Sequence, residues 1–153
     1  MNNRTMPAAA VFPVLVYDDV PSASQWLCDT FGFALLWHAG EHRAVLVLGD
    51  GGVMLGEARD AAPTELGAPA TFAGPRSGPV AHSVMVRVED VDRHYEHALA
   101  LGADVSGPPR DFPYGERQYN ATDIGGHHWT FSQSIADVAP EEWGGTSGLT
   151  TGA

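Results

Sequence analysis

The sequence predicts an α+β fold made of two tandem βαβββ modules. Residues 114–132, YGERQYNATDIGGHHWTFS, hold two alternating runs that meet at a glycine turn, the pattern of a β-hairpin. A weaker copy of this pattern, RAVLVLGDGGVMLG, lies at 43–56. A strand followed by an acidic helix start and a later glycine also occurs twice, around Asp19 and around Asp90. The spacing of about seventy residues is longer than solenoid periods, so it indicates a duplicated module.

The first module begins with a β-branched run at 11–17, VFPVLVY, in which Pro13 indicates an edge position or a bulge. The cluster DDVPS at 18–22 supplies caps for a helix, and Gly32 stands where a left-handed stop belongs. Three more strands are predicted, at 33–38, 41–48 and 53–57.

The second module repeats this order. A strand is predicted at 83–88, a helix from the cluster EDVD at 89–92 to Gly102, a strand at 103–106, and then the hairpin. Between the modules, a stretch rich in Pro, Gly and Ala without periodicity is typical of a linker. We therefore expect these parts: a flexible N-terminus at 1–10, the first module at 11–58, the linker at 59–80, the second module at 81–133 and a C-terminal tail at 134–153.

Composition excludes several functions. With a net charge of −11 and only eight Lys and Arg residues, the chain lacks the cationic surface that nucleic acids or anionic membranes require. The single cysteine, Cys28, cannot form an internal disulfide, which fits a cytoplasmic protein. It lies in an apolar helical pattern, so we expect a buried structural thiol. No apolar run has membrane-spanning length, and the run at 6–16 is read as a tail and a strand because no cleavage site follows it.

Three segments resemble the vicinal oxygen chelate superfamily, which includes glyoxalase I, extradiol dioxygenases, fosfomycin-resistance enzymes and bleomycin-binding proteins. They are PVLVYDDVPSASQWL with the following FGF, GDGGVMLGE, and YGERQYNATDIGGHHWTFS, in which Ile124 replaces the usual Pro. The similarity covers Val11 to Ser132. It implies that the modules form an incomplete barrel around a cleft, where ligands and in many members a divalent metal bind.

The resemblance also implies where the metal ligands would stand. Position by position they fall on Phe12, Ser83, Thr130 and either Met54 or Leu55, none of which is a good divalent-metal ligand. We therefore expect no metal or other cofactor, and a place in the metal-free bleomycin-resistance-like or glyoxalase-like branch. His82 and Glu57 are the weak candidates for an off-pattern metal site.

Alternation along the last strand places His128, Thr130 and Ser132 towards the cleft, and His127, Trp129 and Phe131 away from it. His128 is therefore a weak candidate for a catalytic acid or base. A mostly apolar and aromatic lining with a few polar groups is typical of a small-molecule pocket. The predicted ligand-binding residues are Phe12, Val14, Val16, Trp37, His42, Ser83, Met85, Arg87, Tyr114, Tyr119, His128 and Thr130.

Other polar side chains have ordinary structural interpretations. Glu57 is a potential base, but a solvated strand end is favoured, and His94 and His97 are expected at the helix surface. Arg117 and Asp123 are expected to pair at the hairpin.

The leading functional hypothesis is a metal-free cleft protein that sequesters an aromatic or cationic organic ligand, such as an antibiotic. One alternative is an enzyme, either a glyoxalase-like lyase or dioxygenase with an off-pattern metal site, or a metal-independent catalyst using His128. Another is a module whose cleft serves as a protein interface. Members of this superfamily often dimerise, so we expect a homodimer.

Overall fold

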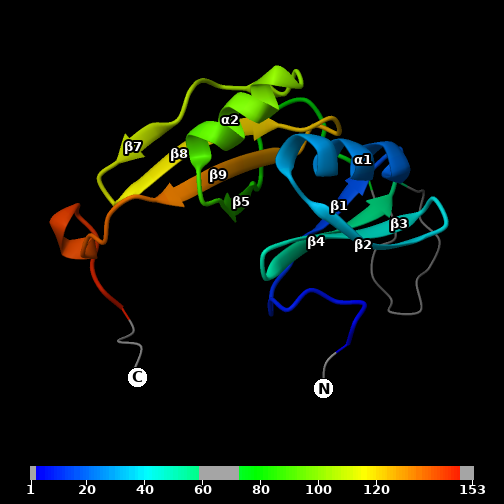
Figure 1. Ribbon diagram of the computed structural model, residues 1–153, viewed down its shortest axis with the longest axis horizontal. Helices are drawn as coiled ribbons and strands as arrows, with labels where there is room; N and C mark the ends of the chain where they lie inside the picture. The colour runs from blue at the N-terminus through cyan, green and yellow to red at the C-terminus, as the bar shows by residue number, and fades with distance from the viewer. Residues whose placement is uncertain (1–2, 59–72, 149–153) are drawn as a thin grey trace. The chain divides into compact units, whose positions relative to one another are not determined.

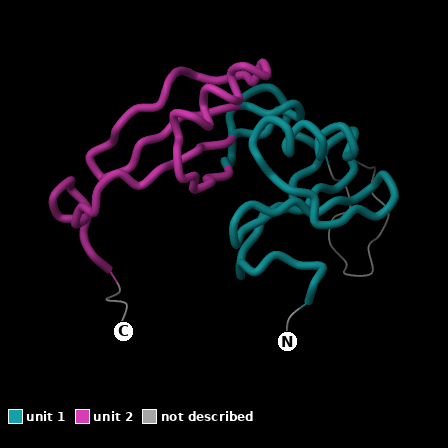
Figure 2. The backbone as a smooth tube through the Cα atoms, in the orientation of Figure 1, with its two compact units in different colours: residues 1–83, 122–128 teal, residues 84–121, 129–153 magenta. Residues whose placement is uncertain are grey.

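A computed structural model of the protein describes residues 3–58 and 73–148. The chain divides into two compact units (Figure 2). The first unit comprises residues 1–83 together with the turn at 122–128, and the second comprises residues 84–121 and 129–153. The module boundaries expected from the sequence stay a prediction.

The first unit contains one βαβββ module (Figure 1). Strand order is β1-β4-β3-β2, with β1 parallel to β4 and the other neighbours antiparallel. Helix α1 packs against one face of this sheet. The elements are β1 Val14–Tyr17, α1 Val20–Phe31, β2 Ala34–Ala39, β3 Arg43–Leu48 and β4 Gly51–Glu57.

Helix α1 begins and ends as the sequence predicts. The Asp19 carboxylate accepts a hydrogen bond from the Ser22 amide at 2.9 Å, which satisfies one of the free donors of the first turn. Gly32 follows the helix with φ of 83°, a left-handed conformation that favours glycine. Leu27 and Phe31 on the inner face of α1 are buried, and so are Leu15 and Leu55 from the sheet.

The second unit repeats the module. Strand order is β5-β9-β8-β6, with β5 parallel to β9, and the extra strand β7 pairs with β8. The elements are β5 Val84–Arg87, α2 Val91–Ala100, β6 Asp104–Val105, β7 Arg110–Phe112, β8 Glu116–Thr122, β9 His128–Ser134 and a 3₁₀ helix at Pro140–Glu142. The predicted α+β class and the two βαβββ modules are confirmed, and β8 and β9 form the hairpin predicted within residues 114–132.

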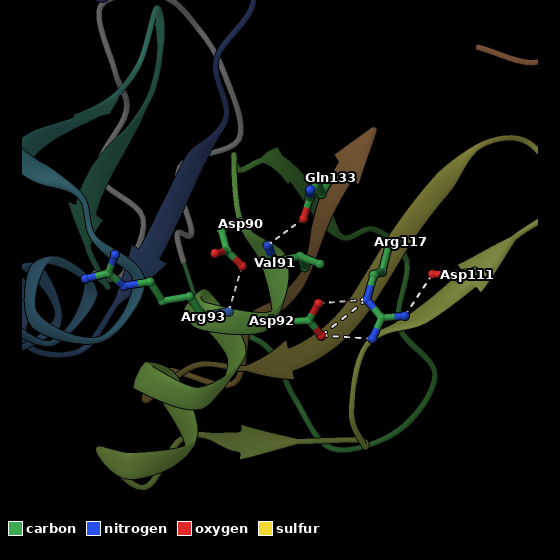
Figure 3. Close-up of polar contacts among 7 residues, drawn as sticks. All are labelled: Asp90, Val91, Asp92, Arg93, Asp111, Arg117 and Gln133. Carbon is green, nitrogen blue, oxygen red and sulfur yellow. Dashed lines mark hydrogen bonds and ion pairs between the residues drawn. The ribbon is translucent and has the colours of Figure 1, made fainter. Parts of the chain in front are cut away.

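Polar contacts fix helix α2 to its own sheet (Figure 3). Asp90 caps the helix by accepting from the Arg93 amide at 3.0 Å, and Gln133 of β9 accepts from the Val91 amide at 3.0 Å. All three guanidinium nitrogens of Arg117 bind carboxylates: Nε and Nη2 contact Asp92, and Nη1 contacts Asp111 at 2.8 Å. The expected pairing of Arg117 with Asp123 is therefore wrong. Strand pairing explains this, because Arg117 lies opposite Asp111 in the register of β7 with β8 and is also bound to Asp92 of α2, whereas Asp123 lies six residues further along the chain.

The sequence does not predict strand β7, because Arg110–Phe112 is short and follows two prolines; its pairing with β8 depends on the turn at Gly115, where φ is 82°. In the N-terminal segment, Ala9 N donates to Asp50 O at 2.9 Å. The flexibility expected for residues 1–10 stays a prediction. No helix in the described ranges is long and apolar enough to cross a membrane.

Candidate functional site

The candidate site lies on the face of the second sheet that points away from α2. Along β9, Trp129 and Phe131 are fully buried, and Phe131 packs against His94 of α2. Thr130 and Ser132 alternate with them and therefore project from the opposite face. In the parallel register Met85 lies beside Thr130, and Arg87 lies beside Ser132. Met85 is 64% exposed, so this face begins with an accessible apolar side chain.

A continuous hydrogen-bond array crosses this face, and Glu116 is its centre. Ser132 Oγ donates to Glu116 Oε2 at 2.7 Å, and Ser134 Oγ donates to Glu116 Oε1 at 2.6 Å. Arg87 Nη1 donates to Ser134 Oγ at 2.7 Å, and Arg87 Nη2 lies 3.9 Å from Glu116 Oε1. Gln118 Nε2 donates to Ser132 Oγ at 3.0 Å. We call Arg87, Glu116, Gln118, Ser132 and Ser134 the Glu116 array.

The array keeps the Glu116 carboxylate ionised. The Ser134 hydrogen bond, the Ser132 hydrogen bond and the charge of Arg87 lower the pKa of Glu116 below its usual value near 4.5, against an opposing effect of burial. The Glu116 side chain is only 19% exposed, whereas that of Arg87 is 75% exposed. Glu116 is therefore a largely buried anion with an exposed cation at its edge.

Aromatic side chains adjoin the array on the β7–β8 side. Tyr114 Oη donates to Gln118 Oε1 at 3.1 Å, so its ring is tied to the array. The ring stacks on Phe112 with centroids 5.3 Å apart and meets Trp143 edge-on at 5.7 Å. Arg110 lies over the Phe112 ring. Tyr114 and Trp143 both keep exposed surface, which can contact an apolar molecule.

This arrangement fits binding better than proton transfer. The hydroxyl groups of Ser132 and Ser134 both donate to Glu116, whose lowered pKa makes it a weak base. An activated nucleophile needs an adjacent base with a matched pKa, usually oriented by a third group. A fixed carboxylate with apolar neighbours instead resembles the lining of a small-molecule site.

The structure brings several predicted residues onto this face and leaves others elsewhere. Met85, Arg87 and Thr130 lie on it, with Thr130 Oγ1 donating to Asn120 Oδ1 at 2.7 Å, and Tyr114 is joined to it. His128 is exposed at the first position of β9, and Ser83 is exposed directly before β5. Sequence reasoning missed Glu116, Gln118 and Ser134, although alternation along the correctly predicted strand β8 would have placed Glu116 and Gln118 beside the last strand.

Tyr119, one of the predicted ligand-binding residues, lies in the core instead. It is 3% exposed and stacks on Phe131 at 5.2 Å, because β8 alternation turns it towards α2. Its hydroxyl is 2.6 Å from His94 Nδ1, and burial is the largest cause that raises the pKa of Tyr119. His94, expected at the helix surface, is consequently half-buried, whereas His97 is exposed as expected.

Several predicted residues of the first unit share one face of its own sheet. The register places Trp37, Val45, Met54 and Val14 in a row across β2, β3, β4 and β1. This row faces away from α1, because the alternating residues Ala44, Leu46 and Leu55 are buried beneath the helix. Val16 follows Val14 on the same face and is buried, and Phe12 is half-buried before β1.

The metal candidates do not form a metal site. Glu57 accepts a short contact from His42 Nδ1, and both side chains are substantially exposed. His82 is exposed and lies outside the strands. Within residues 3–58 and 73–148, no three His, Cys, Asp or Glu side chains are grouped to hold a metal ion. The contacting pair His42 and Glu57 supplies two donors, fewer than the three protein ligands that catalytic zinc sites use. This donor set therefore does not fit the metal that the family resemblance suggests.

The turn segment of the hairpin, DIGGHH at residues 123–128, has a structural role in the first unit. Asp123 Oδ1 accepts from the amides of Gly125 and His127, each at 2.9 Å, and Asp123 Oδ2 accepts from Tyr17 Oη at 2.6 Å. His127 Nε2 donates to Val16 O at 2.7 Å. Burial and the Asp123 charge raise the pKa of Tyr17. These bonds seat the turn on the end of β1.

A cavity of about 350 Å³ lies beside this turn, within the first unit. Its polar lining comes from Asp18, Asp19 and Ser22 at the start of α1, and Tyr17 and Gly125 close another side. Asp19 is occupied as the helix cap, and the Ser22 hydrogen bonds lower its pKa. One of the two carboxylates that line the cavity is therefore already used by the fold.

Comparison with known proteins places this geometry in a family. The sequence profile of the Glyoxalase/Bleomycin resistance protein/Dioxygenase superfamily matches residues 9–131. No curated protein matches the chain. Among solved structures, TioX from Micromonospora sp. ML1 is 34% identical with a TM-score of 0.63, over 83% of this chain and 100% of TioX.

More distant structures share the fold. The glyoxalase/bleomycin resistance protein/dioxygenase from Nocardioides is 23% identical with a TM-score of 0.63, over 94% of this chain and 93% of that one. The fosfomycin resistance protein FosX from Listeria monocytogenes is 13% identical with a TM-score of 0.61, over 90% of this chain and 96% of that one. The profile match covers most of the chain and the similarity to TioX spans the whole of that protein, so the chain belongs to the Glyoxalase/Bleomycin resistance protein/Dioxygenase superfamily.

Proposed function

We propose that the protein binds a small organic molecule with an aromatic ring and a cationic group on the face that carries the Glu116 array. The observation that carries this proposal is the ionised Glu116 carboxylate, held by two serine hydroxyls in a largely buried position. A carboxylate in that setting is a strong acceptor for a cationic donor, because fewer water molecules compete for it.

The apolar neighbours support an aromatic ligand. Met85 is exposed beside the array and offers a polarizable side chain that adapts to flat surfaces. Tyr114 is exposed in part, and its hydroxyl is fixed by Gln118, so its ring is oriented before a ligand arrives. The side chain of Arg87 is 75% exposed and is tied by one hydrogen bond to Ser134, so a cationic ligand would compete with it for Glu116. The chain's net charge of −11 favours the approach of a cation.

We favour sequestration over catalysis. An enzyme of the lyase or dioxygenase type needs a metal site, and the described donors do not form one. A metal-independent enzyme using His128 needs a partner that orients the imidazole and a substrate held beside it. The Glu116 array provides neither of these. It provides a fixed carboxylate beside exposed apolar side chains, which are the features that a binding surface requires.

Isothermal titration with acridine orange, a planar aromatic cation, tests the proposal, with the neutral analogue acridone as its partner. We expect acridine orange to bind wild-type protein and Glu116→Gln to bind it about tenfold more weakly, the scale of one charge-assisted hydrogen bond. Met85→Ala is expected to lower the affinity for both acridine orange and acridone.

Glu96→Gln is the matched control, because it removes the same charge from the exposed surface of α2. It should leave both affinities unchanged. Equal affinities of wild type and Glu116→Gln for acridine orange would reject the site. A stoichiometric divalent metal in protein purified without chelators would favour the enzyme instead.

A further inference from the structure

The C-terminal segment at residues 135–145, which we call the C-terminal clasp, lies beyond the residues that the family profile matches. It is bound to the second unit at the turn between β7 and β8. The amides of Ile135 and Ala136 both donate to Gly115 O, at 2.8 and 3.2 Å. A Cβ on Gly115 would collide with the Ala136 carbonyl and would stand 3.2 Å from Val138 Cγ2. The clasp therefore passes directly over this turn.

Beyond this point the clasp folds back on itself and fixes Trp143. Ala139 N donates to Glu142 Oε2 at 3.0 Å across the 3₁₀ helix. Gly145 N then donates to Pro140 O at 2.8 Å. A Cβ on Gly145 would stand 3.0 Å from Trp143 Cη2, so the backbone lies close against the indole. Trp143 is 42% exposed, and because its own segment already holds it, a ligand that packs on it loses little affinity to ordering this side chain.

Trp143 meets Tyr114, and Tyr114 is joined to the Glu116 array. The two ring centroids are 5.7 Å apart and the ring planes are inclined at 67°. The Tyr114 hydroxyl donates to Gln118, Gln118 Nε2 donates to Ser132, and Ser132 donates to the Glu116 carboxylate. An edge-on pair leaves ring surface of both partners uncovered, and Tyr114 is 36% exposed. The pair thus forms an aromatic corner at the rim of the array.

We infer that Trp143 is a specificity-determining residue of the proposed site, selecting planar cations whose charged ring is extended by further fused rings. Three successive hydrogen bonds separate the Tyr114 hydroxyl from the Glu116 carboxylate, so a single charged ring anchored at Glu116 leaves the corner unfilled. A fused ring system reaches it and packs on both aromatic side chains. Such contacts contribute beyond the area that they bury. The inference rests on the proposed function, because Glu116 anchors the cation.

Three cations that share one charged group and differ in ring number test this selection. They are 4-aminopyridine, 4-aminoquinoline and 9-aminoacridine, which are protonated aminopyridines with one, two and three fused rings. In isothermal titrations at neutral pH, Trp143→Ala should lower the affinity for 9-aminoacridine about tenfold and that for 4-aminopyridine less than about twofold. The loss for 4-aminoquinoline should lie between these values. Trp143→Phe keeps an aromatic ring and should restore most of the lost affinity.

Two further variants separate selection by Trp143 from anchoring by Glu116. Glu116→Gln should lower the affinity for all three cations by a similar factor, because it removes the anchor of the group that they share. Leu101→Ala is the matched control, since it truncates another exposed apolar side chain of the second unit, and it should change none of the affinities.

A direct readout is the ¹⁹F spectrum of protein labelled with 5-fluorotryptophan. Saturating 9-aminoacridine should shift the Trp143 resonance, identified by its loss in Trp143→Phe, more than that of the buried Trp129. An unshifted Trp143 resonance, or an equal effect of Trp143→Ala on all three cations, would overturn the inference and leave the Glu116 site in place. Equal affinities of wild type and Glu116→Gln, or no binding of any cation to wild type, would reject the proposed function and this inference with it.

Discussion

Ser132 Oγ donates a hydrogen bond to Glu116 Oε2 at 2.7 Å and at the same time accepts one from Gln118 Nε2 at 3.0 Å. The hydroxyl is buried, so it orients the carboxylate and links it to the amide of Gln118. This relationship makes Glu116 part of the second unit's stability as well as its proposed site.

The contribution of Glu116 to stability should depend on pH. The folded-state pKa of Glu116 is lowered, so its contribution is complete at neutral pH and is lost as the pH falls through that lowered value. The difference in unfolding free energy between wild type and Glu116→Gln should therefore be largest near about pH 7 and shrink below about pH 4.5. Urea titrations across this range measure it, and a difference that stays constant with pH would contradict the assignment.

Tyr17→Phe should destabilise the protein by about 1–3 kcal/mol, because it removes the buried hydrogen bond that Asp123 Oδ2 accepts from the Tyr17 hydroxyl. Tyr17 is 2% exposed, and its hydroxyl lies 2.6 Å from Asp123 Oδ2. Chemical denaturation gives the value. Tyr114→Phe is the control, since that hydroxyl is at a partly exposed position, and its effect should be smaller. Equal losses of unfolding free energy for the two variants would show that the buried Tyr17 hydrogen bond stabilises the protein no more than that of Tyr114.

Gly125→Ala should also destabilise the first unit. A Cβ at this position would lie 2.4 Å from Tyr17 Cδ1, too close for any side chain, so the turn or the ring must shift. We expect a cost of about 1–3 kcal/mol, the range for overpacking. Gly51→Ala provides the comparison, because its Cβ would meet only Leu48 O at 3.7 Å. Thermal unfolding should separate the two variants clearly, and a Gly125→Ala protein as stable as Gly51→Ala would refute the packing argument.

Asp90→Ala should cost about 1 kcal/mol of stability, the usual effect of removing a helix N-cap. The Asp90 side chain accepts from the Arg93 amide at 3.0 Å and so satisfies one of the free donors of the first turn. Glu89→Ala removes a neighbouring exposed charge but no cap. Urea unfolding of both variants checks the result, which fails if Glu89→Ala costs as much as Asp90→Ala.

The residues themselves determined the local elements of this protein. Acidic caps at Asp19 and Asp90, the stop at Gly32, and the alternation around the hairpin turn all act through neighbours in sequence, and the structure has them as predicted. The duplication of the module could be recognised for the same reason, since each copy repeats these short-range signals.

Tertiary structure alone decided which polar groups meet. Arg117 joins Asp92 and Asp111 because helix α2 and the pairing of β7 with β8 bring these two carboxylates to it. Glu116 gained its serine partners only through the register of β8 against β9, and Tyr119 was drawn into the core by the helix above it. The hydrogen bond from Trp37 to Thr5 spans 32 residues of sequence. Such contacts depend on how strands pair and which face a helix covers, and no short stretch of sequence encodes either.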